Sequence, residues 1–377
     1  MIFQGATSPY PTITISVCMI VKNEEETLAR CLDCAKQFAD EIIVADTGST
    51  DRTKAIAAAY TDKLYDFAWT DDFSDARNFA FSKATMDYLM WLDADDILLA
   101  PDIAKLRSLK QNLSPDTDVV MMRYNTGFDD AGNVTFSFFR ERLLKRTRGF
   151  KWHEPVHEYI AYSGKVVEAD IAVTHKKIKE PAKKRNLEIY EKLLAKDGTL
   201  SPRGMYYYAR ELKDHARWED AAAMLRRFLA RDDGWVEDKI NACLLLSDCE
   251  EQLKHSEQAL TALLKSFQFD LPRAEALCAL GYWFLRNNRL REAVYWFEQA
   301  LSVKPPEKNW GFSQPDCRGY LPCIELAVCH DQLGDTVLAE SYNERAAVFK
   351  PDSAAVAYNR TYFAEKNARN KSTEDGI

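Results

Sequence analysis

Two aspartates one residue apart, Asp93 and Asp95, follow the apolar residues 88–92, and Asp96 adds a third carboxylate directly after them. Carboxylate oxygens are the hard ligands that Mg²⁺ and Mn²⁺ prefer, and such an ion can bridge the oxygens of a diphosphate. A lone Asp-x-Asp pair is a weak signal, because most such pairs are solvated turns. Three carboxylates directly after a buried strand predict a divalent-metal site for a phosphate-bearing ligand.

Three further segments carry polar side chains that should meet these aspartates, although each alone has an ordinary explanation as a cap, a turn or a surface charge. Asp46 closes a second apolar stretch, and its carboxylate is suited to accept from a base N–H or a ribose hydroxyl. Arg77 is expected in the first turn of a helix, where it can bind phosphate oxygens bidentately near the positive end of the helix dipole. The candidate nucleotide-diphosphate site comprises Lys22, Asn23, Glu24, Asp46, Arg77, Asn78 and Asp93, with Asp95 for the metal.

Strands and helices alternate in the first half of the chain. The predicted strands are residues 14–21, 41–46 and 88–92, and the predicted helices are 24–38, 51–60 and a third that is capped by Ser74 or Asp75. This alternation predicts an α/β domain with a doubly wound, mainly parallel sheet over residues 1–176. Ligands of such sheets bind beyond the carboxyl ends of the strands, which is where the candidate residues lie.

The second half changes to helix after helix, with a period of about 34 residues that is typical of tetratricopeptide repeats. The clearest unit, residues 274–305, has small residues at Gly281 and Ala293, where paired helices approach closely. The same frame fits Ala209 with Ala221, Ser247 with Ala259, and Ala327 with Ala339, the last unit following an insertion at 306–319. We therefore expect a helical connector at 177–200, an all-α repeat domain at 201–363 and a polar tail at 364–377.

Composition narrows the classes of function. The 377 residues carry a net charge of −8, which argues against wrapping nucleic acid and implies that a phosphate-bearing substrate needs a metal or a local arginine. No apolar stretch reaches the length of a membrane span, and no secretory signal is evident. Nine scattered cysteines indicate free thiols in a reducing, cytoplasmic setting, and Cys31-x-x-Cys34 is interpreted as helix packing.

The region after residue 119 contains a motif that suggests a different function. His153-Glu154-Pro155-Val156-His157 matches the zinc-protease pattern H-E-x-x-H, with Glu168 downstream as a third ligand. That pattern works only on a helix, where both histidines share a face. Pro155 removes a helical N–H from its middle, and the neighbouring segments 119–125, 134–144 and 165–175 are predicted strands. A zinc protease is therefore disfavoured.

A family resemblance rests on four stretches: residues 15–25, 41–53, 77–80 and 91–96. They resemble family-2 glycosyltransferases of GT-A fold, and especially the bacterial branch that appends tetratricopeptide repeats. The resemblance is strong over residues 13–100 and looser afterwards. It implies that Asp46 and Arg77 contact the nucleotide, that Asp93 faces the ribose and diphosphate, and that Asp95 binds Mn²⁺ or Mg²⁺.

The donor implied by this resemblance is a nucleotide-diphosphate sugar, with UDP as the family's usual nucleotide. Thr47 departs from the pattern, because many relatives have there a second aspartate that reads the pyrimidine. The Q-x-x-R-W sequence of processive synthases is absent, so single or few transfers are expected. Repeat superhelices offer long concave surfaces, so the acceptor, through a hydroxyl or thiol, is expected to be a peptide or protein.

The same resemblance gives roles to the acceptor side. An inverting transferase needs a carboxylate that takes the acceptor's proton, and Glu158, in Val156-His157-Glu158, is the first candidate, with Glu154 second. His175 resembles the late histidine that completes the metal shell. The alternative for His157 and for His175 is a hydrogen-bonded structural residue.

Two other functions compete with this interpretation. A nucleotidyltransferase also uses paired carboxylates, but it would show a Gly-rich basic loop after the first strand, where this chain has Lys22-Asn23-Glu24. A catalytically silent scaffold would act through its repeats alone. The presence of Asp46, Arg77, Asp93 and Asp95 argues against the scaffold.

Overall fold

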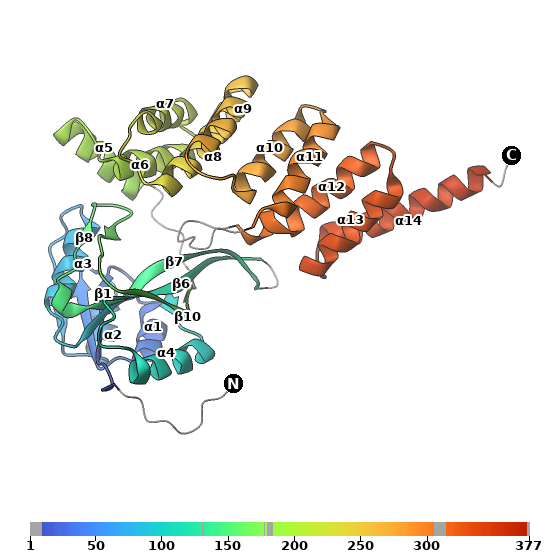
Figure 1. The fold of residues 1–377 in the computed structure, drawn as a ribbon. Coiled ribbons are helices and arrows are strands. Elements are labelled where there is room, and N and C mark those ends of the chain that lie inside the picture. The colour runs from blue at the N-terminus through green and yellow to red at the C-terminus, as the bar shows by residue number, and fades with distance from the viewer. Residues whose placement is uncertain (1–9, 130–131, 177, 179–183, 305–313, 375–377) are drawn as a thin grey trace. The chain divides into compact units, whose positions relative to one another are not determined.

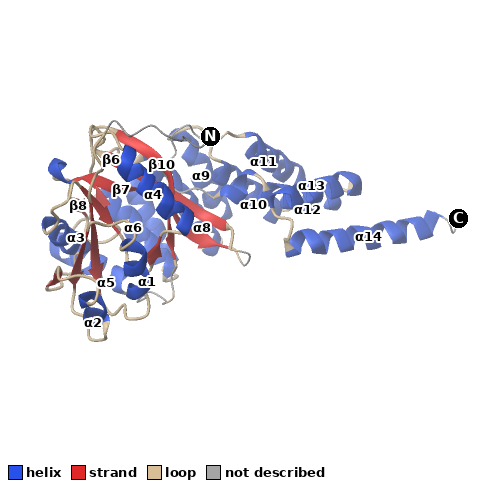
Figure 2. Ribbon diagram, turned by 90° about the horizontal axis from the view of Figure 1, so that it is seen from below, coloured by secondary structure: helices blue, strands red, loops and turns tan. Residues whose placement is uncertain are grey.

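The computed structural model describes residues 10–129, 132–176, 178, 184–304 and 314–374, and the chain divides into two compact units. The first unit ends at Leu200 and the second begins at Ser201. Among the described residues, the strands lie in the first unit and the second is built from helices (Figures 1 and 2). No helix of this described part is long and apolar enough to cross a membrane.

Four parallel strands form one half of the sheet, in the order β3-β2-β1-β4. Their bounds are β1 (Ile15–Val21), β2 (Glu41–Asp46), β3 (Leu64–Asp66) and β4 (Tyr88–Trp91). β2 and β4 are buried throughout and β1 almost so, as strands covered on both faces must be. The predicted strands 14–21, 41–46 and 88–92 are confirmed to within one residue, whereas the short β3 was not predicted.

The other half of the sheet continues the order as β7-β6-β10-β5. Its strands are β5 (Asp96–Ile97), β6 (Val119–Phe128), β7 (Val134–Lys145) and β10 (Val166–His175). β10 runs parallel to β6, while β7 is antiparallel to β4 and β6, and β5 is antiparallel to β10. A separate hairpin pairs β8 (Trp152–His153) with β9 (Tyr159–Ile160). The predicted α/β class is confirmed.

Helices cover this sheet. They are α1 (Leu28–Ala35), α2 (Thr53–Ala58), α3 (Phe73–Ser82) and α4 (Ala100–Asn112). A short 3-10 turn lies at Arg146–Arg148, and α5 (Arg185–Asp197) is the last helix of the first unit. Alternate residues of β1, among them Val17 and Met19, share one core cluster with α1, α2 and α4. Helix α3 packs against β1 and β2 without contributing to that cluster.

The start of α3 corrects a prediction that matters for the site. The N-cap is Asp72, whose side chain accepts from the backbone N–H of Asp75, and not Ser74 or Asp75. Because the helix therefore begins at Phe73, Arg77 lies in its second turn rather than its first. The positive end of the helix dipole therefore acts less strongly on Arg77 than expected, since that effect falls off within the first turn.

The second unit consists of antiparallel helix pairs. They are α6 (Pro202–Asp214) with α7 (Trp218–Leu229), α8 (Val236–Gln252) with α9 (Ser256–Lys265), α10 (Ala274–Arg286) with α11 (Leu290–Ser302), and α12 (Tyr320–Gln332) with α13 (Thr336–Phe349), followed by α14 (Ala354–Glu374). Short 3-10 turns occupy Ser266–Gln268 and Pro315–Arg318. Helix α14 extends through most of the segment that was expected to be a polar tail. Residues 306–313 of the expected insertion, and residues 177 and 179–183 of the expected connector, lie outside the described residues.

The four helix pairs share the same type of turn between their two helices and the same small, buried residues where the helices meet. At each turn a residue with positive φ follows the first helix: Ala216, Lys254, Asn288 and Gly334. The next N–H then bonds a carbonyl five residues back, a Schellman-type closure. The small residues of the predicted frame are buried, and a Cβ on Gly281 would lie 2.6 Å from the Phe297 ring. These repeated features are those expected of tetratricopeptide-type units.

Candidate active site

Arg77 lies between two carboxylates. Its Nη2 donates to Asp93 Oδ1 at 2.8 Å and its Nε donates to Glu158 Oε1 at 2.5 Å. Arg77 is 8% exposed, and its guanidinium carbon lies 4.9 Å from the centre of the Trp152 ring. Burial opposes ionisation of Asp93, but the positive charge of Arg77 outweighs it and holds the pKa of Asp93 below its usual value. Three predicted residues from distant parts of the chain therefore meet here.

Asn78 holds in place the segment that delivers Glu158. Its Nδ2 donates to the carbonyl of Trp152 at 3.0 Å, and its Oδ1 accepts from the N–H of Trp152 at 2.9 Å. A further backbone bond joins Phe73 to the carbonyl of Pro155. Asn78 therefore positions β8, and the direct donor contact expected of it stays a prediction.

The H-E-x-x-H segment is not helical. His153 belongs to β8, while Glu154 and His157 have φ values of 73° and 53°, in the left-handed region. The two histidines thus lack the shared helix face that a zinc protease needs. Glu154, the second candidate for the base, lies half-buried in this turn, while Glu158 comes just before β9.

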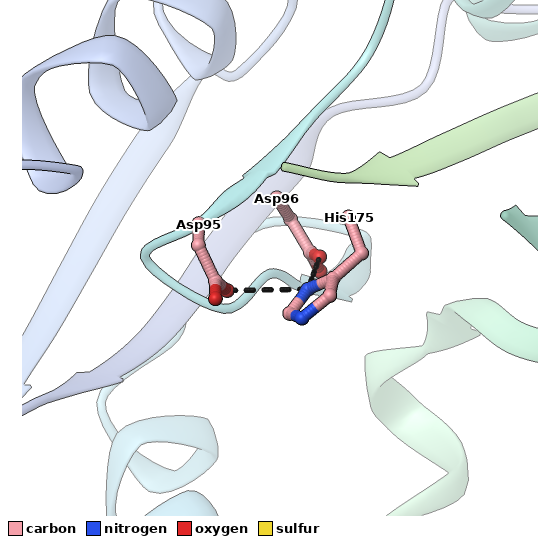
Figure 3. A group of neighbouring side chains, drawn as sticks. All are labelled: Asp95, Asp96 and His175. Atoms are coloured by element: carbon pink, nitrogen blue, oxygen red, sulfur yellow. Dashed lines mark hydrogen bonds and ion pairs between the residues drawn. The ribbon is translucent and has the colours of Figure 1, made fainter. Parts of the chain in front are cut away.

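Asp95, Asp96 and His175 form a cluster that could hold a metal ion (Figure 3). Nδ1 of His175 lies 3.3 Å from Asp95 Oδ1 and 3.2 Å from Asp96 Oδ1. Pairing of β5 with β10 creates this proximity, because His175 is the register partner of Asp96. Burial opposes protonation of His175, but hydrogen bonds to both aspartates raise its pKa to about 10. Carboxylate oxygens and an imidazole nitrogen are donors that suit Mn²⁺, and the oxygens suit Mg²⁺.

Two cysteines of α1 contact backbone carbonyls at the aspartate loop and just after β5. Cys31 Sγ lies 3.3 Å from the carbonyl oxygen of Asp93, and Cys34 Sγ lies 3.5 Å from that of Leu98. Both thiols are buried and free, as are the other seven cysteines. Burial is the main cause that raises the pKa of both thiols. The interpretation of Cys31-x-x-Cys34 as helix packing agrees with these contacts.

The two carboxylate oxygens of Asp46, the last residue of β2, have different surroundings. Asp46 Oδ1 accepts from the N–H groups of Gly48 and Ser49 at 2.9 and 2.8 Å. Asp46 Oδ2 is buried and has no hydrogen-bond partner among the described residues. Such an atom is costly unless a ligand satisfies it, so Asp46 is suited to bind a donor group of a nucleotide.

Asn23 and Glu24 organise these loops. Asn23, at a positive φ of 55°, accepts the N–H of Thr50 on its Oδ1 at 2.8 Å. The N–H of Glu24 donates to Thr53 Oγ1 at 2.7 Å, and its carboxylate accepts from Thr27. Lys22 is exposed at the end of β1. Of the predicted nucleotide residues, Asn23 and Glu24 therefore shape the loop beside Asp46.

Several residues around the site escaped the sequence prediction. Trp91 lies between arginines, with the guanidinium carbon of Arg142 at 3.5 Å and that of Arg140 at 4.8 Å from its ring centre. Tyr124 donates from its hydroxyl to Asp96 Oδ1 at 2.8 Å. The one signal in the sequence was Asp96 itself, third in the run of carboxylates. The missed residues are Trp91, Tyr124, Arg140, Arg142 and Trp152.

Known proteins resemble parts of this chain. Residues 16–169 match the model of the glycosyl transferase family 2. A TPR repeat-containing protein of Synechococcus elongatus is 42% identical over 147 residues, covering 39% of this chain and 35% of that protein. The SPbeta prophage-derived glycosyltransferase SunS of Bacillus subtilis is 26% identical over 283 residues, covering 71% of this chain and 65% of SunS.

The match extends over only part of each relative, since the chain spans about a third to two thirds of the length of these curated proteins. Among solved structures, the crystal structure of MamA aligns with 51% of this chain and 99% of its own, at 18% identity and a TM-score of 0.36. The resemblance seen in the sequence is confirmed: residues 16–169 match the model of the glycosyl transferase family 2, and tetratricopeptide-type helix pairs follow in the second unit.

Proposed function

We propose that this chain transfers a sugar from a nucleotide-diphosphate sugar, with UDP as the nucleotide, to a hydroxyl or thiol of an acceptor. The observation that carries this proposal is the meeting of Arg77, Asp93 and Glu158 beside the Asp95 and His175 pair. This is the edge of the sheet, beyond the carboxyl ends of β1, β2 and β4, where α/β sheets bind ligands. The family match supports glycosyl transfer as the reaction class.

The nucleoside would bind at the loops after β1 and β2. The unpartnered Oδ2 of Asp46 supports a hydrogen bond from a base N–H or a ribose hydroxyl. Asn23 and Glu24 hold the neighbouring loop rigid, and exposed Lys22 could reach a phosphate. A contact of Arg77 with the diphosphate stays a prediction, because its Nε and Nη2 are already bonded to carboxylates.

Asp95 and His175 would hold a Mn²⁺ or Mg²⁺ ion. When bound, such an ion neutralises the diphosphate and makes it a better leaving group. The donor set fits this task, since one carboxylate and one imidazole, each about a quarter exposed, face one another. Asp93, held by Arg77, is proposed to face the ribose and diphosphate.

Glu158 is the proposed general base of an inverting, non-processive transfer. Its side chain is 13% exposed and is fixed by Arg77, which gives it one orientation beside Asp93. A base must lie within hydrogen-bond reach of the acceptor's proton, and a fixed carboxylate satisfies that geometric condition. Glu154 in the preceding turn is the alternative base.

The repeat unit is proposed to bind the acceptor, which would be a peptide or protein. Stacked helix pairs give extended surfaces for chains, and successive pairs pack together here through α7 with α8 and α11 with α12. The free state of all nine cysteines fits a reducing compartment, and we propose the cytoplasm.

Release of nucleoside diphosphate from a panel of sugar nucleotides, with and without Mn²⁺, tests the proposal. We expect release with a UDP-sugar, its loss on chelation, and its loss in Asp95→Asn at unchanged thermal stability. A nucleotidyltransferase would instead form a nucleotidyl bond and release pyrophosphate. If the helix pairs of the second unit bind a peptide or protein but the chain turns over no sugar nucleotide under any metal condition, the protein is a scaffold and the proposal is wrong.

A further inference from the structure

Arg142 is an extra residue in strand β7. In the pairing of β6 with β7, Val120 faces Leu143 and Met121 faces Glu141, so Arg142 has no partner across the ladder. An insertion of this kind, a β-bulge, redirects a side chain and is common beside active sites. The side chain of Arg142 is fully buried, and its guanidinium carbon lies 3.5 Å from the centre of the Trp91 ring and 4.3 Å from that of Tyr124.

Asp96 is the carboxylate to which this guanidinium is hydrogen-bonded. Arg142 Nη1 donates to Asp96 Oδ2 at 3.2 Å and to the carbonyl of Trp91 at 2.9 Å. A buried arginine without a counter-charge would be very costly, so the bulge is coupled to this aspartate. Arg142 and Asp96 are both 0% exposed.

The lone pairs of Asp96 are already used. Oδ1 accepts from the Tyr124 hydroxyl at 2.8 Å and lies 3.2 Å from His175 Nδ1. Oδ2 accepts from Arg142 and also from the N–H of Asp93, the latter at 3.2 Å. An ionised carboxylate offers about four acceptor positions, and here four groups occupy them.

Asp95 differs from its neighbour in this respect. It is 25% exposed and faces His175, which is 24% exposed, whereas Asp96 has no surface at all. In Figure 3 the second ring nitrogen of His175 points away from both aspartates. An incoming ion can therefore reach Asp95 and the outer nitrogen of His175 without breaking any contact of Asp96.

We propose that Asp96 is not a metal ligand but the residue that orients His175, and that Arg142 and Tyr124 are positioning residues that hold the carboxylate of Asp96 in place. This inference rests on the metal-dependent function proposed above. An Nδ1–H of His175 donating to Asp96 selects the tautomer that leaves Nε2 as the ligand atom. The bulge at Arg142 thereby contributes to the metal site from a strand that provides no ligand.

Mn²⁺ binding to the full chain tests this inference without any measurement of transfer. The affinity is measured by the loss of the free-ion signal in electron paramagnetic resonance, and pulsed spectra report whether a histidine nitrogen is bound. The variants are Asp95→Asn, Asp96→Asn, Arg142→Lys and Tyr124→Phe. Tyr88→Phe is the matched control, because it removes another buried tyrosine hydroxyl, which donates to the carbonyl of Thr117 at 2.6 Å.

We expect Asp95→Asn to abolish binding and Asp96→Asn, Arg142→Lys and Tyr124→Phe to weaken it by up to the 10–100-fold typical of outer-shell changes. The histidine signal should be present in the wild type and altered in Asp96→Asn, while Tyr88→Phe should bind Mn²⁺ normally. If Arg142→Lys fails to fold, the Mn²⁺ affinity of Tyr124→Phe still tests the inference.

Two results would overturn the inference and can be told apart. If Asp96→Asn abolishes binding as Asp95→Asn does, and Tyr124→Phe matches Tyr88→Phe, Asp96 is a ligand and only this inference fails. If the wild-type chain binds no Mn²⁺ with or without UDP, the metal part of the proposed function fails together with it.

Discussion

Arg77 and Glu158 are bonded at 2.5 Å although 81 residues separate them in the sequence. The pair joins helix α3 to the turn before β9, and Asp93 completes it from the loop after β4. One cation therefore holds in place both the proposed base and the first residue of the Asp-x-Asp pair.

The first prediction concerns the stability that this cation provides. Arg77→Met leaves two carboxylates facing each other without a counter-charge, so the free energy of unfolding should fall by about 3 kcal/mol. That value is at the low end for buried pairs, because the Asp93 side chain is 32% exposed. Urea unfolding measures it, and adding Glu158→Gln should restore part of the loss. A loss below about 1 kcal/mol would show that the cluster is solvated.

The sequence predicted the central strands because burial on both faces leaves nearly continuous apolar runs. It did not predict the cap of α3, because Asp72, Ser74 and Asp75 are all capable caps within four positions, and propensity alone cannot choose between them. Nor did it predict Arg142, since a bulge depends on how two strands pair, and no local pattern of residues encodes it. The run of three aspartates was visible, but only the fold separates buried Asp96 from accessible Asp95.

The second prediction identifies the base. Glu158→Gln keeps a side-chain oxygen that can accept from Arg77 but cannot take a proton, so the transfer rate should fall by roughly 10²–10⁴. Donor affinity, measured by calorimetry, should stay near normal. Glu154→Gln is the matched control in the same turn and should remain active. The opposite pattern, with Glu154→Gln inactive and Glu158→Gln active, would assign the base to Glu154.

The third prediction is a pH dependence that is independent of the site. Burial opposes ionisation of Glu41, but hydrogen bonds from Lys63, Ser16 and Thr85 lower its pKa to about 2. An unfolded glutamate titrates near pH ~4.3, so the stabilisation is complete above that pH and is lost as the pH falls toward 2. The stability difference between wild type and Glu41→Gln should therefore shrink between pH 5 and pH 2.5 in urea unfolding. A difference that stays constant over this window would rule out an ionised Glu41 as its source.

The fourth prediction tests the close approach of the paired helices α10 and α11. A Cβ at position 281 would lie 2.6 to 2.8 Å from atoms of the Phe297 ring, which is fully buried. Alanine normally gains roughly 1 kcal/mol over glycine inside a helix, but overpacking costs about 1–3 kcal/mol. Gly281→Ala should therefore lower stability or leave it no higher. Phe297→Leu removes the ring that crowds position 281, so the double variant Gly281→Ala with Phe297→Leu should be more stable than the sum of the two single effects predicts. If the two effects simply add, the ring does not limit this contact.

The last prediction separates the roles of the two units by truncation. Helix α5 belongs with the first unit: the Tyr190 hydroxyl donates to the carbonyl of Val156 at 3.3 Å, and Lys192 pairs with Asp71 at 2.6 Å. A chain ending at residue 200 should therefore fold and bind the donor with unchanged affinity, because every proposed donor contact lies before it. A chain ending at residue 176 lacks these anchors to the turn that carries Glu158 and should be less stable to heat.

If the repeats bind the acceptor, the chain that ends at residue 200 should hydrolyse or transfer from the donor only slowly, and its KM for a peptide acceptor should rise strongly. Donor affinity by calorimetry and acceptor kinetics on the same preparation distinguish the two roles. Acceptor kinetics equal to those of the full chain would refute acceptor binding by the helix pairs and leave them a role in assembly. Loss of donor affinity in this truncation, with its fold intact, would instead show that the second unit contributes to the donor site, contrary to the placement of Asp46, Asp93 and Asp95 in the first.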